Sequence, residues 1–139
     1  FVAEIAGRRF YNDSLATTPE STIVALDAFV EPIVLLAGGY DKQVDLGAMA
    51  EAISQKAKAV ALIGNTAELL ADLIDENANG RPLPCRECRS LKDAFDWAIE
   101  NSSAGDVVLL SPGCASYDWF RNFADRGDQF IELVRSWRP

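Results

Sequence analysis

Apolar runs alternate with amphipathic stretches along most of the chain. Three runs are apolar throughout and end in glycine or in Ser-Pro-Gly: Ile33–Ala37, Ala59–Ile63 and Val107–Leu110. Stretches with helical spacing lie between and after them, from Leu46 to about Ala57, Thr66 to Asn77, Leu91 to Asn101 and about Gly127 to Trp137. Strands that are apolar along their whole length and alternate with amphipathic helices are typical of a parallel sheet covered on both faces.

The N-terminal part of the pattern differs. Phe1–Ile5 and Arg8–Tyr11 are short, partly alternating runs around Ala6-Gly7, which predicts a β-hairpin. A helix follows, with Thr17 or Thr18 as its cap, Pro19 in its first turn, and Ile23, Leu26, Phe29 and Val30 on its apolar side. A further short strand is predicted at Pro84–Arg86. The fold class is therefore α/β: one Rossmann-like three-layer domain over 1–139, with a mostly parallel sheet of about six strands, an N-terminal hairpin and helices on both faces.

Composition narrows the function. The 139 residues carry 13 Lys and Arg against 21 Asp and Glu, a net charge of -8, which opposes binding to nucleic acid or to an anionic membrane. Histidine is absent, which excludes Ser-His and Cys-His catalysis and histidine metal ligands within this chain. No window reaches the roughly 18 apolar residues of a membrane helix, so we expect a soluble protein. The three cysteines fit a reducing cytosol better than a disulfide scaffold, so we expect a cytoplasmic one. Because the chain opens in apolar sequence without Met, we also expect a piece of a longer polypeptide.

Three polar clusters follow strands whose carboxyl ends should share one edge of the sheet, where ligands bind in such folds. Asn12-Asp13-Ser14, with Thr17, supplies polar groups, although such residues before a helix are often simple caps. Gly38-Gly39 with Lys42 could let backbone approach an anion, or form a glycine turn beside a solvated lysine. Ser111–Ser116, continuing to Phe123, could cradle a carboxylate or form an ordinary turn.

The cysteine pair and the glycine motifs say less about the function. Cys85 and Cys88 have the spacing of a metal or redox pair, but zinc wants four ligands and only Cys114 remains. Ordinary loop thiols are the favoured interpretation, with a weaker redox alternative in which Arg86 and Arg89 lower a thiolate pKa. Neither a P-loop nor a G-x-G-x-x-G sequence is present, so the domain does not hold nucleotide phosphates by those devices.

Taken together, three segments in this order and spacing resemble the C-terminal domain of the Mur ligase family, and within it the branch that adds D-glutamate. The segments are Tyr11–Thr22, Leu36–Lys42 and Leu110–Gly127, and the resemblance runs from residue 1 to about residue 137. It implies that 1–139 is the C-terminal domain of a three-domain, ATP-dependent ligase of peptidoglycan synthesis. Such an enzyme adds D-glutamate to UDP-N-acetylmuramoyl-L-alanine, with ATP and magnesium held mainly by the central domain.

The resemblance also implies residue roles. Thr17 and Lys42 match positions that contact D-glutamate, Ser116 and the Phe123 backbone match those that receive its side-chain carboxylate, and Asp13 matches an acidic residue at the nucleotide. No catalytic residue and no metal ligand is expected in this fragment alone, which we expect to be inactive.

One departure concerns the family's usual Asn-Asp-Ser-Lys, where Leu15 replaces the lysine and removes a cation. The competing hypothesis is a non-catalytic α/β small-ligand-binding or receiver-like module. A receiver would want clustered acids where the first parallel strand ends, but Ile33–Ala37 ends in two glycines.

Overall fold

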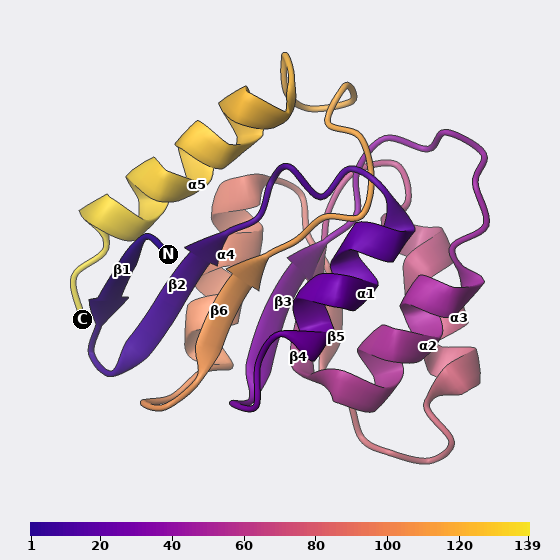
Figure 1. The fold of residues 1–139 in the computed structure, drawn as a ribbon, viewed down its shortest axis with the longest axis horizontal. Coiled ribbons are helices and arrows are strands. Elements are labelled where there is room, and N and C mark those ends of the chain that lie inside the picture. The colour runs from indigo at the N-terminus through magenta and orange to yellow at the C-terminus, as the bar shows by residue number, and fades with distance from the viewer.

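The computed structural model describes residues 1–139 and contains one six-stranded sheet between two layers of helices (Figure 1). The strands are β1 (Ala3–Ile5), β2 (Arg8–Asn12), β3 (Ile33–Ala37), β4 (Ala57–Leu62), β5 (Cys85–Glu87) and β6 (Val107–Leu110). The helices are α1 (Pro19–Asp27), α2 (Gly47–Lys56), α3 (Ala67–Asn77), α4 (Leu91–Glu100) and α5 (Phe123–Ser136).

The sheet has the strand order β1-β2-β6-β3-β4-β5. Only β1 is antiparallel, paired with β2, and every other neighbouring pair is parallel. The last strand, β6, lies in the middle between β2 and β3, with Asn12 beside Leu110 and Leu36 beside the same residue. The loops after β2, β3, β4 and β6 therefore emerge at one edge, which is the upper edge in Figure 1.

The strands are buried on both faces, which is why they are apolar throughout. Side chains of α1, α2 and α3 pack on one face, around Leu35, Val60 and Leu109. Side chains of α4 and α5 pack on the other, around Phe10, Leu36 and Val108. This is the predicted three-layer α/β arrangement. None of the five helices combines the length and the apolarity needed to cross a membrane.

Strand β4 begins at Ala57 rather than Ala59 and ends at Leu62, and β5 is shifted by one residue from the predicted Pro84–Arg86. The larger differences from the predicted boundaries concern two helices. The last helix begins at Phe123 rather than near Gly127, because the Asn122 side chain accepts a hydrogen bond from the Asp125 N–H at 2.8 Å and caps an earlier turn. Helix α1 ends at Asp27, so the prediction that Val30 belongs to its apolar side is wrong. Val30 is fully exposed in the connection to β3.

Candidate functional site

A cavity of about 290 Å³ lies at the carboxyl edge of the sheet. The start of α1, the loop after β3 and the loop after β6 form it, and its lining includes both Thr17 and Lys42. The two residues thus come together from different loops, 25 positions apart in the sequence. Lys42 is the one basic side chain in the lining, which also contains Glu20, Asp41 and Asp45.

Two of those acidic groups serve the loop itself. Asp41 accepts a hydrogen bond from the Gln43 N–H at 2.8 Å, and Asp45 accepts one from the Gly47 N–H at 2.8 Å. Each bond closes a local turn of the kind that aspartate stabilises. Lys42 is therefore the middle residue of the first turn, between Asp41 and Gln43.

The glycine pair after β3 has a structural role. A Cβ on Gly38 would lie 2.3 Å from the Ile63 carbonyl oxygen, and one on Gly39 would lie 2.4 Å from the Ala115 carbonyl oxygen. Gly38 also has φ +104°, in the region that favours glycine. The backbone here approaches neighbouring loops of the protein, so the expectation that these glycines admit a ligand is replaced by the glycine-turn interpretation.

Thr66 also lines the cavity, although the sequence indicated only that it lies at the start of a helix. Its Oγ1 accepts a hydrogen bond from the Gly39 N–H at 2.9 Å, and its own N–H donates to the Gly39 carbonyl at 3.1 Å. The Thr66 hydroxyl also lies 3.6 Å from the Cys114 Sγ. Thr66 is buried, lines the cavity, and holds the loops after β3, β4 and β6 together.

Ser116 and Phe123 lie outside the cavity lining. Ser116 is buried and directly follows Ala115, which does line the cavity. Phe123 is the first residue of α5 and is exposed, and its carbonyl accepts a 2.6 Å hydrogen bond from the Ser14 hydroxyl. Its N–H belongs to the first turn of a helix, where backbone donors lack intrahelical partners.

Asp13 lies at a second hollow, separate from the first. This hollow has a volume of about 510 Å³, and most of its lining is apolar, including Tyr11, Val24 and Phe29. Asp13 accepts a 2.8 Å hydrogen bond from the Ser111 hydroxyl, which fixes its carboxylate at the rim. Leu15 lines the same hollow with 69% of its surface exposed, so the residue that departs from the family pattern extends an apolar surface.

Arg126 is the residue that sequence reasoning missed. Its side chain is fully buried, and its guanidinium donates to the Ser14 hydroxyl at 2.9 Å, the Ser14 carbonyl at 2.8 Å and the Cys114 carbonyl at 3.0 Å. Burial lowers the pKa of Arg126 to about 10, so it stays charged at neutral pH. One cation thereby connects the loop after β2, the loop after β6 and α5. A signal existed, because Arg126 precedes buried Phe130 and Val134 at a spacing of four on the inward side of α5.

The cysteines contradict the redox alternative. Cys85 is exposed on the edge strand β5 and Cys88 is buried just after it. Partial desolvation of the sulfur, together with the negative charge of Glu87 near Cys85 and of Asp93 near Cys88, raises the pKa of each thiol to about 11, and the lowering by Arg86 at Cys88 is smaller than this effect. Burial also raises the pKa of Cys114. These are weakly nucleophilic thiols, and no group of three or more Cys, Asp or Glu side chains is placed to hold a metal ion.

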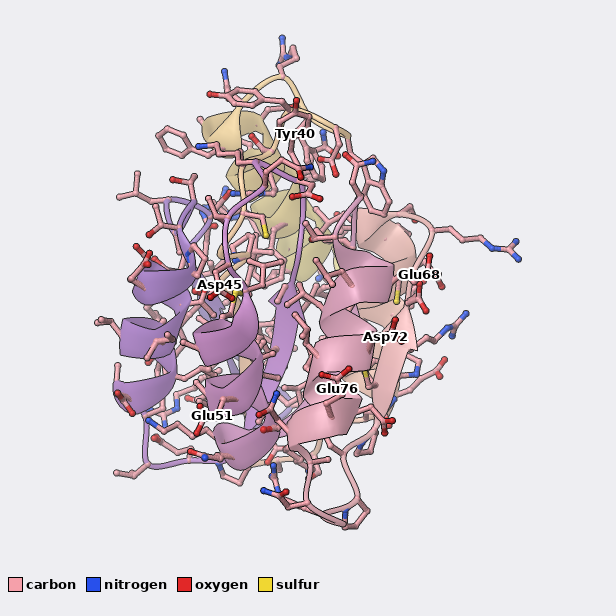
Figure 2. All side chains as sticks on the ribbon, turned by 90° about the vertical axis from the view of Figure 1, so that its right-hand side faces the viewer. Tyr40, Asp45, Glu51, Glu68, Asp72 and Glu76 are labelled. Atoms are coloured by element: carbon pink, nitrogen blue, oxygen red, sulfur yellow. The ribbon has the colours of Figure 1, made fainter.

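Besides the three acidic residues in the cavity lining, four acidic residues lie on α3 and one lies on α2, outside the lining. Figure 2 shows Glu51 along α2 and Glu68, Asp72 and Glu76 along α3, while Tyr40 lies at the carboxyl edge above them. Lys42, two residues after Tyr40, therefore supplies a local positive charge at one end of an acidic molecule. A small anion with hydrogen-bonding groups is the ligand that such a cavity suits.

Nearly the whole chain is similar to known proteins of one family. Residues 1–114 match the family described as Mur ligase, glutamate ligase domain. The chain is 43% identical over 139 residues to a UDP-N-acetylmuramoylalanine--D-glutamate ligase of Acetivibrio thermocellus, covering 97% of this chain and 30% of that protein. It is 45% identical over 134 residues to the ligase of the same name in Latilactobacillus sakei, covering 96% of this chain and 29% of that one. The chain thus spans about 30% of the length of these curated relatives.

Solved structures support the fold. A crystal structure of UDP-N-acetylmuramate-alanine ligase from Thermotoga maritima aligns with a TM-score of 0.54 at 18% identity, over 86% of this chain and 25% of that one. A domain from Haemophilus ducreyi, described as part of a UDP-N-acetylmuramate:L-alanyl-gamma-D-glutamyl-diaminopimelate ligase, aligns with a TM-score of 0.59 at 13% identity and covers 95% of each chain. At these identities the likeness concerns the fold alone.

Proposed function

The chain belongs to the Mur ligase family as its glutamate ligase domain, and from this premise we propose that it is the C-terminal domain of a three-domain ligase that adds D-glutamate to UDP-N-acetylmuramoyl-L-alanine. The observation that carries the proposal is the shared cavity of Thr17 and Lys42 at the carboxyl edge. D-Glutamate is a dicarboxylate of the size that such a cavity takes, and it needs one fixed cation and several hydrogen-bond donors. The match to relatives named for this reaction supports the same substrate.

We propose these roles for the chain's own residues. The Lys42 ammonium pairs with one carboxylate of D-glutamate, and the Thr17 hydroxyl donates to it. The Ser116 hydroxyl and the Phe123 N–H donate to the other carboxylate. Asp13, held at the second hollow by Ser111, contacts the nucleotide when the domains close.

The reaction balances without a catalytic group from this domain. ATP transfers its γ-phosphoryl group to the muramoyl-alanine carboxylate and releases ADP, the D-glutamate amine attacks the acyl phosphate, and the tetrahedral intermediate collapses to an amide with loss of phosphate. This domain contributes by placing the amine near the acyl carbon, an effect of positioning worth several kcal/mol, roughly 7–11 in well-oriented reactions. We propose a cytoplasmic location, because the proposed reaction consumes ATP.

The chain's residues do not fit a magnesium site, since no suitable cluster of ligands exists. They also lack a P-loop. We therefore propose that the other domains hold magnesium and most of ATP, and that the 139 residues alone form no product.

The test is a substitution in the full-length ligase. Lys42→Ala removes a charged hydrogen bond worth roughly 1.5–3 kcal/mol, so the KM for D-glutamate should rise about 10- to 100-fold. The KM for ATP should stay the same, and Lys42→Arg should recover part of the loss. Lys92→Ala is the matched control, because Lys92 lies on α4 in an exposed pair with Asp96. An unchanged KM for D-glutamate in Lys42→Ala would remove Lys42 from the site.

A second measurement uses the domain itself. A nuclear magnetic resonance titration with D-glutamate should shift the amides of Lys42, Ser116 and Phe123, with a Kd on the order of 1 mM or weaker for this half-site. Shifts confined to other residues would reject the assignment. Reading the gene upstream separates the ligase from a stand-alone binding module, since only the ligase requires a P-loop domain there.

A further inference from the structure

Two tyrosines lie side by side at the mouth of the candidate site. Tyr40 comes from the loop after β3, and Tyr117 comes from the loop after β6. Their ring centroids are 6.0 Å apart and the rings meet edge to face at 73°. Tyr40 is 41% exposed and Tyr117 66% exposed, and Tyr40 lines the cavity of about 290 Å³. Figure 2 shows Tyr40 at this end of the molecule, away from the acidic helix faces.

Backbone hydrogen bonds join the two loops beneath the rings, and the first of them runs from the Gly38 N–H to the Pro112 carbonyl at 2.9 Å. Tyr40 and Ala115 form an isolated antiparallel bridge, with the Tyr40 N–H donating to the Ala115 carbonyl at 2.8 Å. Gly39, held by Thr66, approaches the same carbonyl so closely that no Cβ fits. On the solvent side of this bridge, the Tyr40 and Tyr117 rings contact each other and connect the two loops.

The bridge and the rings are close in sequence to the groups assigned to the two ends of the substrate. Tyr40 precedes Lys42 by two residues, and Tyr117 directly follows Ser116. Any opening of the loops about the bridge would therefore change the separation between the Lys42 loop and Ser116. A dicarboxylic amino acid held at both ends is sensitive to that separation, since glutamate and aspartate differ by one methylene.

We propose that Tyr40 and Tyr117 form a clasp, the edge-to-face ring pair above the Tyr40–Ala115 bridge, that sets this separation and so favours D-glutamate over the shorter D-aspartate. The inference rests on the proposed function. The tyrosines act as positioning residues, because they hold the loops that carry the binding groups. The contact between the two rings carries the effect.

The first test measures specificity in the full-length ligase. An edge-to-face pair supports an effect of about three- to tenfold. Tyr40→Ala and Tyr117→Ala should each raise the KM for D-glutamate by this factor and lower the D-glutamate to D-aspartate ratio of kcat/KM similarly, with the KM for ATP unchanged. The double variant should match either single variant, because removing one ring already removes the contact. Tyr40→Phe and Tyr117→Phe should behave as wild type.

Trp119→Ala is the matched control. Trp119 is an exposed aromatic residue of the same loop, but its ring packs on Phe120, so its removal should leave the ratio unchanged. An unchanged ratio in both tyrosine-to-alanine variants, or additive effects in the double variant, would overturn the clasp.

A second test does not depend on the substrate. In hydrogen exchange on the full-length protein, Tyr117→Ala should speed exchange of the Tyr40 amide several-fold, and Trp119→Ala should not. Wild-type enzyme that fails to ligate D-glutamate would refute the proposed function. Ligation by wild type, with unchanged specificity and exchange in the tyrosine variants, would reject the clasp alone.

Discussion

Replacing Arg126 by methionine tests how the site is held in place. The substitution keeps an unbranched side chain in a fully buried position but removes all three hydrogen bonds to Ser14 and Cys114. The Ser14 hydroxyl retains its bond to the Phe123 carbonyl, whereas the carbonyls of Ser14 and Cys114 lose their side-chain donor. The perturbation therefore acts on two backbone acceptors inside the protein.

The expected cost follows from those two carbonyls. A buried acceptor without a partner costs roughly 1–3 kcal/mol, so the loss of a donor at both carbonyls should lower the free energy of unfolding by about 2–6 kcal/mol. That is a large share of the roughly 5–15 kcal/mol of a typical domain. Because the loops after β2 and β6 would also lose their common anchor, D-glutamate binding in the full-length ligase should weaken.

Urea unfolding of the 139-residue chain, followed by circular dichroism, measures the change. Arg121→Met is the control, since the Arg121 side chain is 87% exposed and its pair with Asp125 spans 3.5 Å. An exposed pair contributes about 0–1 kcal/mol, so the control should be nearly as stable as wild type. Equal stability of the Arg126→Met and Arg121→Met variants would show that the buried guanidinium does not hold these loops.

Three further results are expected. Thr66→Val removes the acceptor of the Gly39 N–H and should raise the KM for D-glutamate about fivefold to tenfold. Steady-state kinetics should show recovery in Thr66→Ser, and equal KM values for the two variants would refute this. Gly39→Ala places a Cβ 2.4 Å from the Ala115 carbonyl and should lower the unfolding free energy by roughly 1–3 kcal/mol, which an unchanged urea midpoint would contradict. Alkylation of Cys85 and Cys88 at pH 8 should be about 100-fold slower than that of a thiol of pKa 9, because a pKa of about 11 leaves that much less thiolate. The rate should increase with pH up to about pH 11, and a plateau near pH 9 would refute the raised pKa values.

The architecture was predictable because burial on both faces leaves a direct mark on the strands. Ile33–Ala37 and Val107–Leu110 have no polar position, and only a sheet between two helical layers hides such segments. The start of α5 was not predictable in the same way. Asn122 lies in a polar stretch where several residues could cap a helix, and only the bond to the Asp125 N–H selects it.

The site could be predicted only in part, for a related reason. Sequence order places Thr17 and Lys42 at strand ends, and the parallel sheet then brings those ends to one edge. The groups that fix the loops there depend on contacts between distant segments. Arg126 reads as a surface charge until the loop carbonyls of Ser14 and Cys114 are seen around it, and Gly39 reads as open space for a ligand until Ala115 fills that space.

These contacts bear on how an acidic domain would bind the dicarboxylate proposed as its substrate. The net charge of -8 opposes a dicarboxylate at long range, but four of the acidic residues lie on α3, and their effect is screened over about 8 Å at physiological ionic strength. At short range, the Lys42 ammonium attracts the carboxylate that we propose it contacts. Arg126, in contrast, is fully buried, and its guanidinium donates hydrogen bonds to backbone carbonyls. The two cations thus have different roles. Arg126 connects the loops, and Lys42 remains available to the ligand. Because attraction is confined to contact distance, affinity should depend on the geometry of the loops more than on the total charge of the domain.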